Sequence, residues 1–238
     1  MNKLHILTPV KDSLETTLRT IDSIMKSEVT FEFTYTVYND FSSDETTEIL
    51  EKKSAESGFT LINLKQITMH PSPNYLMILQ MAQHSANFEN VHLMIIESDV
   101  IVEKDTIQQF YDCILTLEKP GLIAAVTNDI HGIINFPYLY AKRFNSGIIN
   151  TRKRLSFCCT LLTQPLLTTF NFDALNPEKN WYDVFISHKS IELGFNNYLL
   201  TSLPVLHLPH SSRPWKNLKY TNPLKYYFNK IVQKRDKI

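Results

Sequence analysis

Glycine and cysteine are scarce in this sequence of 238 residues, which has 5 Gly and 3 Cys. Cys113, Cys158 and Cys159 supply neither a disulfide framework nor the spaced ligands of a zinc site, so we expect a reducing, cytoplasmic compartment. The N-terminus has no apolar signal-peptide core, and no apolar run reaches the roughly 20 residues that span a bilayer. The sequence therefore predicts neither a secreted nor an integral membrane protein.

Net charge is also absent, since 24 Lys and Arg balance 24 Asp and Glu. The length predicts one large domain, and 11% aromatic residues argue against general disorder. Charge is uneven, however, because residues 211–238 carry eight basic residues against a single acid, Asp236. Apolar residues recur at helical spacing in this tail, as Leu224, Tyr227, Phe228, Ile231 and Val232.

Two interpretations of this tail stay open. It forms either an amphipathic helix on the anionic inner face of the plasma membrane, as a peripheral contact, or a solvated helix packed on the domain. Binding of nucleic acid is not expected, because basic residues confined to one terminus offer little readout of bases.

Strands and helices alternate over the first half of the chain. Apolar runs predict strands at 4–10, 31–38, 59–64 and 91–96, and spacings of three and four predict helices between them. This alternation predicts a doubly wound, mostly parallel α/β sheet with helices on both faces. Beyond residue 100 the pattern predicts a helix at 104–117, a strand at 122–126, an irregular stretch at 127–160, helices at 161–170 and 181–193, and a strand at 198–206.

Ligands of such sheets lie at the carboxyl ends of the strands, and no glycine-rich loop follows any predicted strand here. Binding of phosphate through backbone amides is therefore not expected. Instead, Glu97-Ser98-Asp99 follows a buried strand, and carboxylates at i and i+2 of a strand point the same way. The pair would share a divalent cation that bridges to diphosphate oxygens; the alternative is that it only ends the strand and caps the next helix.

These strand ends resemble the signatures of family-2 nucleotide-diphosphosugar glycosyltransferases of GT-A fold. Asn39-Asp40-Phe41-Ser42-Ser43-Asp44-Glu45-Thr46 resembles the family's Asp-Asp-Gly-Ser-x-Asp-x-Thr, and Glu97-Ser98-Asp99 stands where the family has Asp-x-Asp. The resemblance implies that Asp40 contacts the base beside Thr8 and Val10, with Asn74 near the donor. It also implies that Asp99 and Glu97 hold Mn²⁺ or Mg²⁺, and that Ser98 lies at the nucleotide.

The resemblance continues downstream. Tyr182-Asp183 followed by Gly194 keeps the spacing of the family's Glu-Asp motif, which implies that Asp183 is the general base; the alternative is a residue that only caps its helix. His207, at the end of the last strand, matches a histidine near the metal. The implied protein has a catalytic domain over 1–210, with a nucleotide-sugar half (1–100) and an acceptor half (101–210).

The resemblance implies an inverting, metal-dependent transfer of sugar from a nucleotide-diphosphosugar, with a UDP-sugar favoured. The hydroxyl acceptor would be a saccharide or a lipid-linked saccharide, in the synthesis of bacterial surface polysaccharide. One alternative is a non-catalytic module that binds sugar nucleotides or a partner, which the departures at Asn39, Tyr182 and Phe185 favour. A nucleotidyltransferase ranks lower, since Lys11 is the lone basic residue after the first strand.

Overall fold

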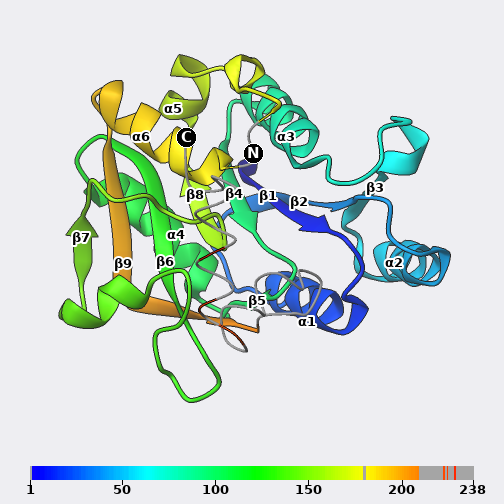
Figure 1. Cartoon of the computed structure of the whole chain (residues 1–238), viewed down its shortest axis with the longest axis horizontal. Helices are drawn as coiled ribbons and strands as arrows, with labels where there is room; N and C mark the ends of the chain where they lie inside the picture. Colours follow the sequence, from blue (N-terminus) through cyan, green and yellow to red (C-terminus); the bar gives the residue numbers. More distant parts are fainter. Residues whose placement is uncertain (1, 179–180, 209–221, 223, 225–227, 229–238) are drawn as a thin grey trace.

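The computed structural model describes residues 2–178, 181–208, 222, 224 and 228 (Figure 1). Apart from three single positions, the predicted tail helix at 211–238 lies outside these residues, so neither interpretation of it is tested. No helix among the described residues has the length and the apolar composition needed to cross a membrane.

Within the described residues, nine strands form one sheet in the order β3-β2-β1-β4-β8-β6-β9-β5, and β7 pairs with β9. Strands β1, β2, β3 and β4 pair in parallel, as do β6 and β9, whereas β8 runs antiparallel to both of its neighbours. The strands are β1 (Asn2–Val10), β2 (Glu32–Asn39), β3 (Thr60–Asn63), β4 (His92–Ile96), β5 (Val100–Ile101), β6 (Pro120–Asn128), β7 (Ile148–Asn150), β8 (Cys159–Leu162) and β9 (Asn196–His207).

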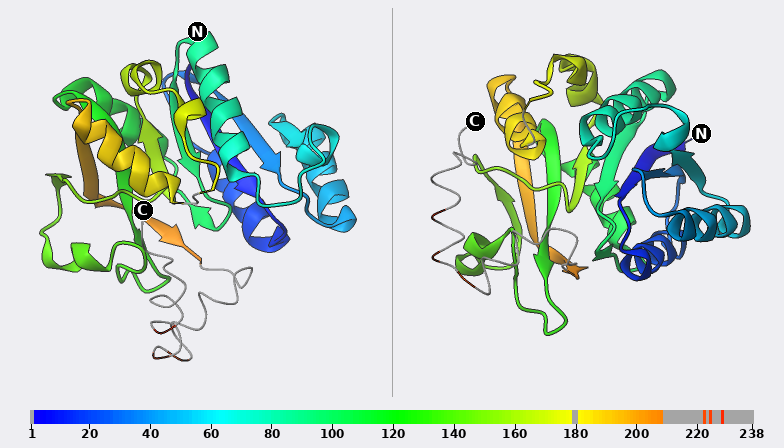
Figure 2. Two further views of the ribbon diagram at one scale, coloured as in Figure 1. Left: turned by 45° about the horizontal axis from the view of Figure 1, so that its top comes forward. Right: turned by 45° about the vertical axis from the view of Figure 1, so that its right-hand side comes forward.

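Helices cover both faces of the sheet, so the predicted fold class is confirmed (Figures 1 and 2). The helices are α1 (Leu14–Met25), α2 (Asp44–Ser57), α3 (Tyr75–Glu89), α4 (Thr106–Thr116), α5 (Gln164–Thr169) and α6 (Tyr182–Glu192), with short 3-10 turns η1 (Leu64–Gln66), η2 (Leu139–Arg143) and η3 (Phe172–Ala174). Helices α3, α5 and α6 pack on one face, while α1, α2 and α4 pack on the other.

Successive residues of the central strands alternate between these two cores. In β4, Leu93 and Ile95 belong to the α3 side, and Met94 and Ile96 belong to the α1 side. Both sets are fully buried. This explains why residues 93–96 of the strand are all apolar, as expected for a strand covered on both faces.

The acceptor half departs from the sequence-based expectation in three places. The stretch 127–160, expected to be irregular, contains β7 and the start of β8. Leu161 and Leu162, expected in a helix, lie in β8 because they pair with β4 and β6 in the middle of the sheet. The residue spacing in the helix predicted at 181–193 places Phe185 and His188 on its inward face, but in α6 both are exposed. The helix instead buries two serines, Ser187 and Ser190, whose hydroxyls are hydrogen-bonded.

Candidate active site

The carboxyl ends of β2, β1 and β4 meet at one edge of the sheet, because these neighbouring strands are parallel. Asp40 directly follows β2, and its backbone N–H donates to the Val10 carbonyl at the end of β1 (2.8 Å). Glu97-Ser98-Asp99 directly follows β4. The fold therefore brings the first and second predicted site segments to the same edge.

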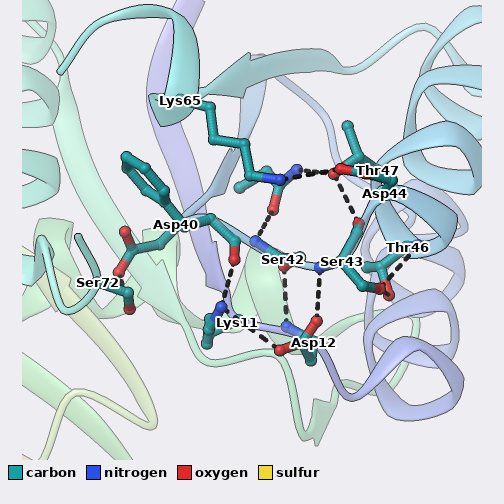
Figure 3. Close-up of polar contacts among 12 residues, drawn as sticks. Lys11, Asp12, Asp40, Ser42, Ser43, Asp44, Thr46, Thr47, Lys65 and Ser72 are labelled. Atoms are coloured by element: carbon teal, nitrogen blue, oxygen red, sulfur yellow. Dashed lines mark hydrogen bonds and ion pairs between the residues drawn. The ribbon is translucent and has the colours of Figure 1, made fainter. Parts of the chain in front are cut away.

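The Asp40 carboxylate is buried and accepts three hydrogen bonds from one loop. Its Oδ2 accepts from the Ser72 hydroxyl (2.7 Å) and the Asn74 backbone N–H (2.9 Å), and its Oδ1 accepts from the Asn74 side-chain amide (2.8 Å). Figure 3 shows the carboxylate turned toward Ser72 and away from Asp12. Asp40 and Asn74, predicted separately as nucleotide contacts, thus form one unit.

A second set of contacts fixes the turn that follows Asp40 (Figure 3). The Asp12 carboxylate accepts from the Ser43 backbone N–H (2.9 Å), and the Asp12 backbone N–H donates to the Ser42 hydroxyl (2.9 Å). Lys11 donates to the Phe41 carbonyl. These contacts connect the loop after β1 to the loop after β2, so hydrogen bonds fix the backbone that carries Asp40.

Asn39 stands where the family pattern has an aspartate, and its contacts explain the amide. Its side-chain N–H₂ donates to Thr47 and to Asn63, both at 2.9 Å, while its oxygen accepts from the Ser42 N–H (3.2 Å). A carboxylate has no N–H to donate. The departure at Asn39 therefore serves the packing of this turn.

Thr8 and Val10 lie at the predicted edge, but their side chains lie in the core. The Thr8 side chain is fully buried and its hydroxyl accepts from the Tyr35 hydroxyl (3.0 Å), while Val10 packs in the core on the α1 side. The two side chains are therefore not available to a ligand at this edge.

Glu97-Ser98-Asp99 forms a tight turn rather than an extension of β4, which corrects the geometry expected from the sequence. The Val100 N–H donates to the Glu97 carbonyl (3.1 Å), and β5 begins at Val100. The alternation of a strand therefore does not set the directions of the two carboxylates. Their contacts differ: the buried Cys158 thiol donates to Glu97 Oε2 (3.4 Å), whereas Asp99 faces β9.

Asp99 and His207 form a buried pair. His207 Nε2 lies 3.5 Å from Asp99 Oδ2, and the two side chains are 8% and 9% exposed. Pairing of β5 with β9 sets this contact, because Val100 is opposite His207. The other ring nitrogen, Nδ1, lies 3.4 Å from the Asn135 side-chain oxygen. Of the predicted metal ligands, the fold therefore brings Asp99 and His207 into direct contact.

The donor chemistry of this pair fits a divalent cation of the Mg²⁺ or Mn²⁺ type. Such ions bind through one or two protein groups and complete their shell with substrate phosphates and water. The Asp99 carboxylate is the type of ligand that both ions prefer, and the His207 imidazole beside it can add a nitrogen ligand to Mn²⁺. Across the part of the chain that the structure describes, no three His, Cys, Asp or Glu side chains are grouped as a site that would hold a metal ion alone. Diphosphate oxygens would have to complete the shell.

Asp183 lies in the first turn of α6, and its carboxylate meets a basic residue that our sequence analysis did not single out. Arg154 Nη1 lies 3.6 Å from Asp183 Oδ2, and the two side chains are 37% and 19% exposed. Nothing local signals this pair, because β8, α5 and η3 all lie between the two residues in the sequence.

Tyr138 and Cys158 are both buried, and the charges of these acids act on them. Burial raises the pKa of the Cys158 thiol well above its usual range, and the charges of Glu97 and Asp99 raise it further. Burial likewise raises the pKa of Tyr138, with smaller contributions from Cys158 and from the Asp183 carboxylate. The charges of Glu97 and Asp99 therefore act on Cys158. The charges of Cys158 and Asp183 in turn act on Tyr138.

The family model "Glycosyl transferase family 2" matches residues 5–168, so this chain belongs to glycosyltransferase family 2. The matched residues include Asp40 and Asp99 and end before Asp183 and His207. A search of curated proteins finds no match.

Among solved structures, the fold is similar to glycosyltransferases. S. aureus TarS (residues 1–349) in complex with UDP-GlcNAc is 16% identical, with a TM-score of 0.68, covering 89% of this chain and 60% of that one. The mannosyltransferase PcManGT of Pyrobaculum calidifontis, in complex with GDP-Man and Mn²⁺, is 12% identical, with a TM-score of 0.64, covering 97% and 64%. At this identity the likeness concerns the fold, and the chain spans less than two thirds of either neighbour.

Proposed function

We propose that this protein is a metal-dependent, inverting glycosyltransferase that moves a sugar from a nucleotide-diphosphosugar to a hydroxyl acceptor. The observation that carries the proposal is the buried Asp99–His207 pair, 3.5 Å apart, at the strand edge shared with Asp40 in a family-2 fold. Membership of the family supports sugar transfer, and the setting we propose, assembly of a bacterial surface polysaccharide, rests on the family resemblance alone.

In this proposal the nucleotide binds at the Asp40 end of the edge. Asp40 Oδ1 accepts a single hydrogen bond, so it has acceptor capacity for an N–H of a base. Thr8 and Val10 would line the base with their backbone, and Asn74 would hold the Asp40 carboxylate in place. A UDP-sugar is our preferred donor, because a structural neighbour binds UDP-GlcNAc; another neighbour binds GDP-Man, so the donor panel includes both bases.

Asp99 and His207 are the residues that would hold Mn²⁺ or Mg²⁺, with Glu97 and Ser98 beside the diphosphate. Bound there, the cation supplies positive charge to the diphosphate oxygens. Asp183 would accept the proton of the acceptor hydroxyl; it lies in the first turn of α6, within the proposed acceptor half. Arg154 would orient the Asp183 carboxylate.

Hydrolysis of a panel of UDP- and GDP-sugars, with and without Mn²⁺, tests the proposal. We expect hydrolysis that needs Mn²⁺, that Asp99→Asn abolishes, and that Asp183→Asn lowers by 10²-fold or more with little change in nucleotide affinity. The matched control is Asp44→Asn, an exposed acid of the same turn region whose carboxylate pairs with Lys65. Nucleotide binding without turnover of any donor would contradict the proposal and favour a non-catalytic binding module.

A further inference from the structure

One long segment of the acceptor half, residues 131–171, has basic residues but no acidic ones. Between Ile130 and Phe172 the chain has five basic residues and no aspartate or glutamate, although the whole chain is neutral. Three of these basic residues, Arg143, Lys153 and Arg154, lie around a pair of neighbouring rings, Tyr140 and Phe144. The clustering is a property of the fold, because η2 and the segment before β8 supply them separately.

The contacts around Tyr140 define this basic–aromatic cluster. The Lys153 ammonium lies 4.5 Å from the centroid of the Tyr140 ring, and the Tyr140 hydroxyl donates to the Arg154 carbonyl (3.5 Å). The Arg143 guanidinium lies 5.3 Å from the Phe144 ring, which meets the Tyr140 ring edge-on at 6.3 Å. Burial raises the pKa of Tyr140, and the positive charges of Arg154 and Arg143 oppose that rise. Both cations therefore act on the same hydroxyl.

Among the described residues, two of the three charges of this cluster have no carboxylate partner. Arg143 and Lys153 are exposed, and neither forms an ion pair with a described carboxylate. Lys142, next to Arg143, differs from them because its charge acts on the Asp129 carboxylate. Arg154 connects the cluster to Asp183, from which it lies 3.6 Å.

We propose that Arg143, Lys153 and Arg154 bind a phosphate group carried by the acceptor, beside Asp183. The inference rests on the proposed function, since it names the class of acceptor for that site. A phosphate presents oxygens in a tetrahedral arrangement and contacts several cations at once, whereas a carboxylate presents two coplanar oxygens that one guanidinium already satisfies. Three cations from two segments fit the phosphate.

The test measures binding of three probes with the same ring: glucose, glucose 6-phosphate and glucuronic acid. They are titrated into the full chain saturated with UDP and Mn²⁺, so that the diphosphate site is filled. We expect glucose 6-phosphate to bind at least tenfold more tightly than the other two. Arg143→Gln and Lys153→Gln each weaken phosphate binding by roughly fivefold, the value of a partly exposed charge contact, and leave glucose binding unchanged. Lys142→Gln is the matched control and keeps the preference.

Equal affinities for the three probes would overturn the inference, as would glucuronic acid binding as tightly as the phosphate, or an equal loss in Lys142→Gln. A phosphate on a lipid-linked saccharide and a phosphodiester of a polymer share this chemistry. Measuring turnover with each of these two acceptors shows which one the enzyme uses. With that acceptor, the Arg143 and Lys153 variants should have a higher KM for the acceptor and an unchanged kcat. Donor hydrolysis is the independent readout: if it is present while the preference is absent, only the acceptor inference fails.

Discussion

Replacing Asp40 with asparagine should destabilise the protein because the surrounding donors leave no place for an N–H₂ group. If the new amide nitrogen takes the place of Oδ1, it faces the Asn74 side-chain N–H₂. Asn74 cannot flip without cost, since that N–H₂ also donates to the His70 carbonyl (3.0 Å). If the nitrogen takes the place of Oδ2, it faces the Asn74 backbone N–H. At least one buried hydrogen bond to a charged acceptor is lost in either orientation.

A hydrogen bond to a charged group contributes about 1.5–3 kcal/mol, so we expect Asp40→Asn to lower the free energy of unfolding by about 2 kcal/mol. For a domain of this size the corresponding fall in Tm is about 4–8 °C. Urea denaturation and thermal melts of wild type and variant measure both quantities. Asp44→Asn is the control, because the Asp44 side chain is 93% exposed and its pairing with Lys65 should contribute less than about 1 kcal/mol. Equal stabilities of Asp40→Asn and wild type would refute the hydrogen-bond argument.

Two further predictions concern the packing of the acceptor half. A methyl group at Gly121 would overlap the Ser190 hydroxyl and lie 2.8 Å from the Phe195 Cβ, so Gly121→Ala should cost about 1–3 kcal/mol in urea denaturation; wild-type stability would contradict the packing described. Burial raises the pKa of the Cys158 thiol, so at pH 8 the native protein should be alkylated at half-buried Cys113 and not at Cys158, as measured by mass spectrometry. Equal rates at the two thiols would contradict the burial, and unfolding in urea, which exposes both, is the control.

The nucleotide half was predictable from sequence because its signals are local. Apolar runs such as the one at 91–96 predicted strands that are buried on both faces. The polar residues directly after these runs indicated where the strands end. Asp40 could be placed at the edge for that reason. Its actual partners could not be, since Ser72 and Asn74 are 32 and 34 residues away.

The acceptor half was less predictable because its structure depends on distant partners. Strand β8 is inserted antiparallel between β4 and β6, with Ile96 opposite Cys159, and a four-residue apolar strand resembles the start of a helix in sequence. The inward face of α6 was misassigned because the residue spacing that placed Phe185 and His188 there gave no sign that Ser187 and Ser190 are buried. Exposed Phe185 packs against Phe170, with 6.1 Å between the ring centroids. Ser187 is buried, and its hydroxyl donates to the Asp183 carbonyl, so its polar group is satisfied there.

The Asp183–Arg154 and Asp99–His207 contacts illustrate the same limit. Family resemblance suggested three of these residues one at a time, and only the fold put them in pairs. Arg154 had no signal of its own, because it is one of three consecutive basic residues, 152–154, that look alike in sequence. Its contact with Asp183 is formed only in the folded chain.

A crystal of the full chain soaked with UDP and Mn²⁺ tests the central claim most directly. The account predicts anomalous density for manganese bonded to the Asp99 carboxylate and to Nε2 of His207, with the uracil ring against the Asp40 carboxylate. Manganese bound elsewhere on the diphosphate, and not to Asp99 or His207, would contradict this expectation.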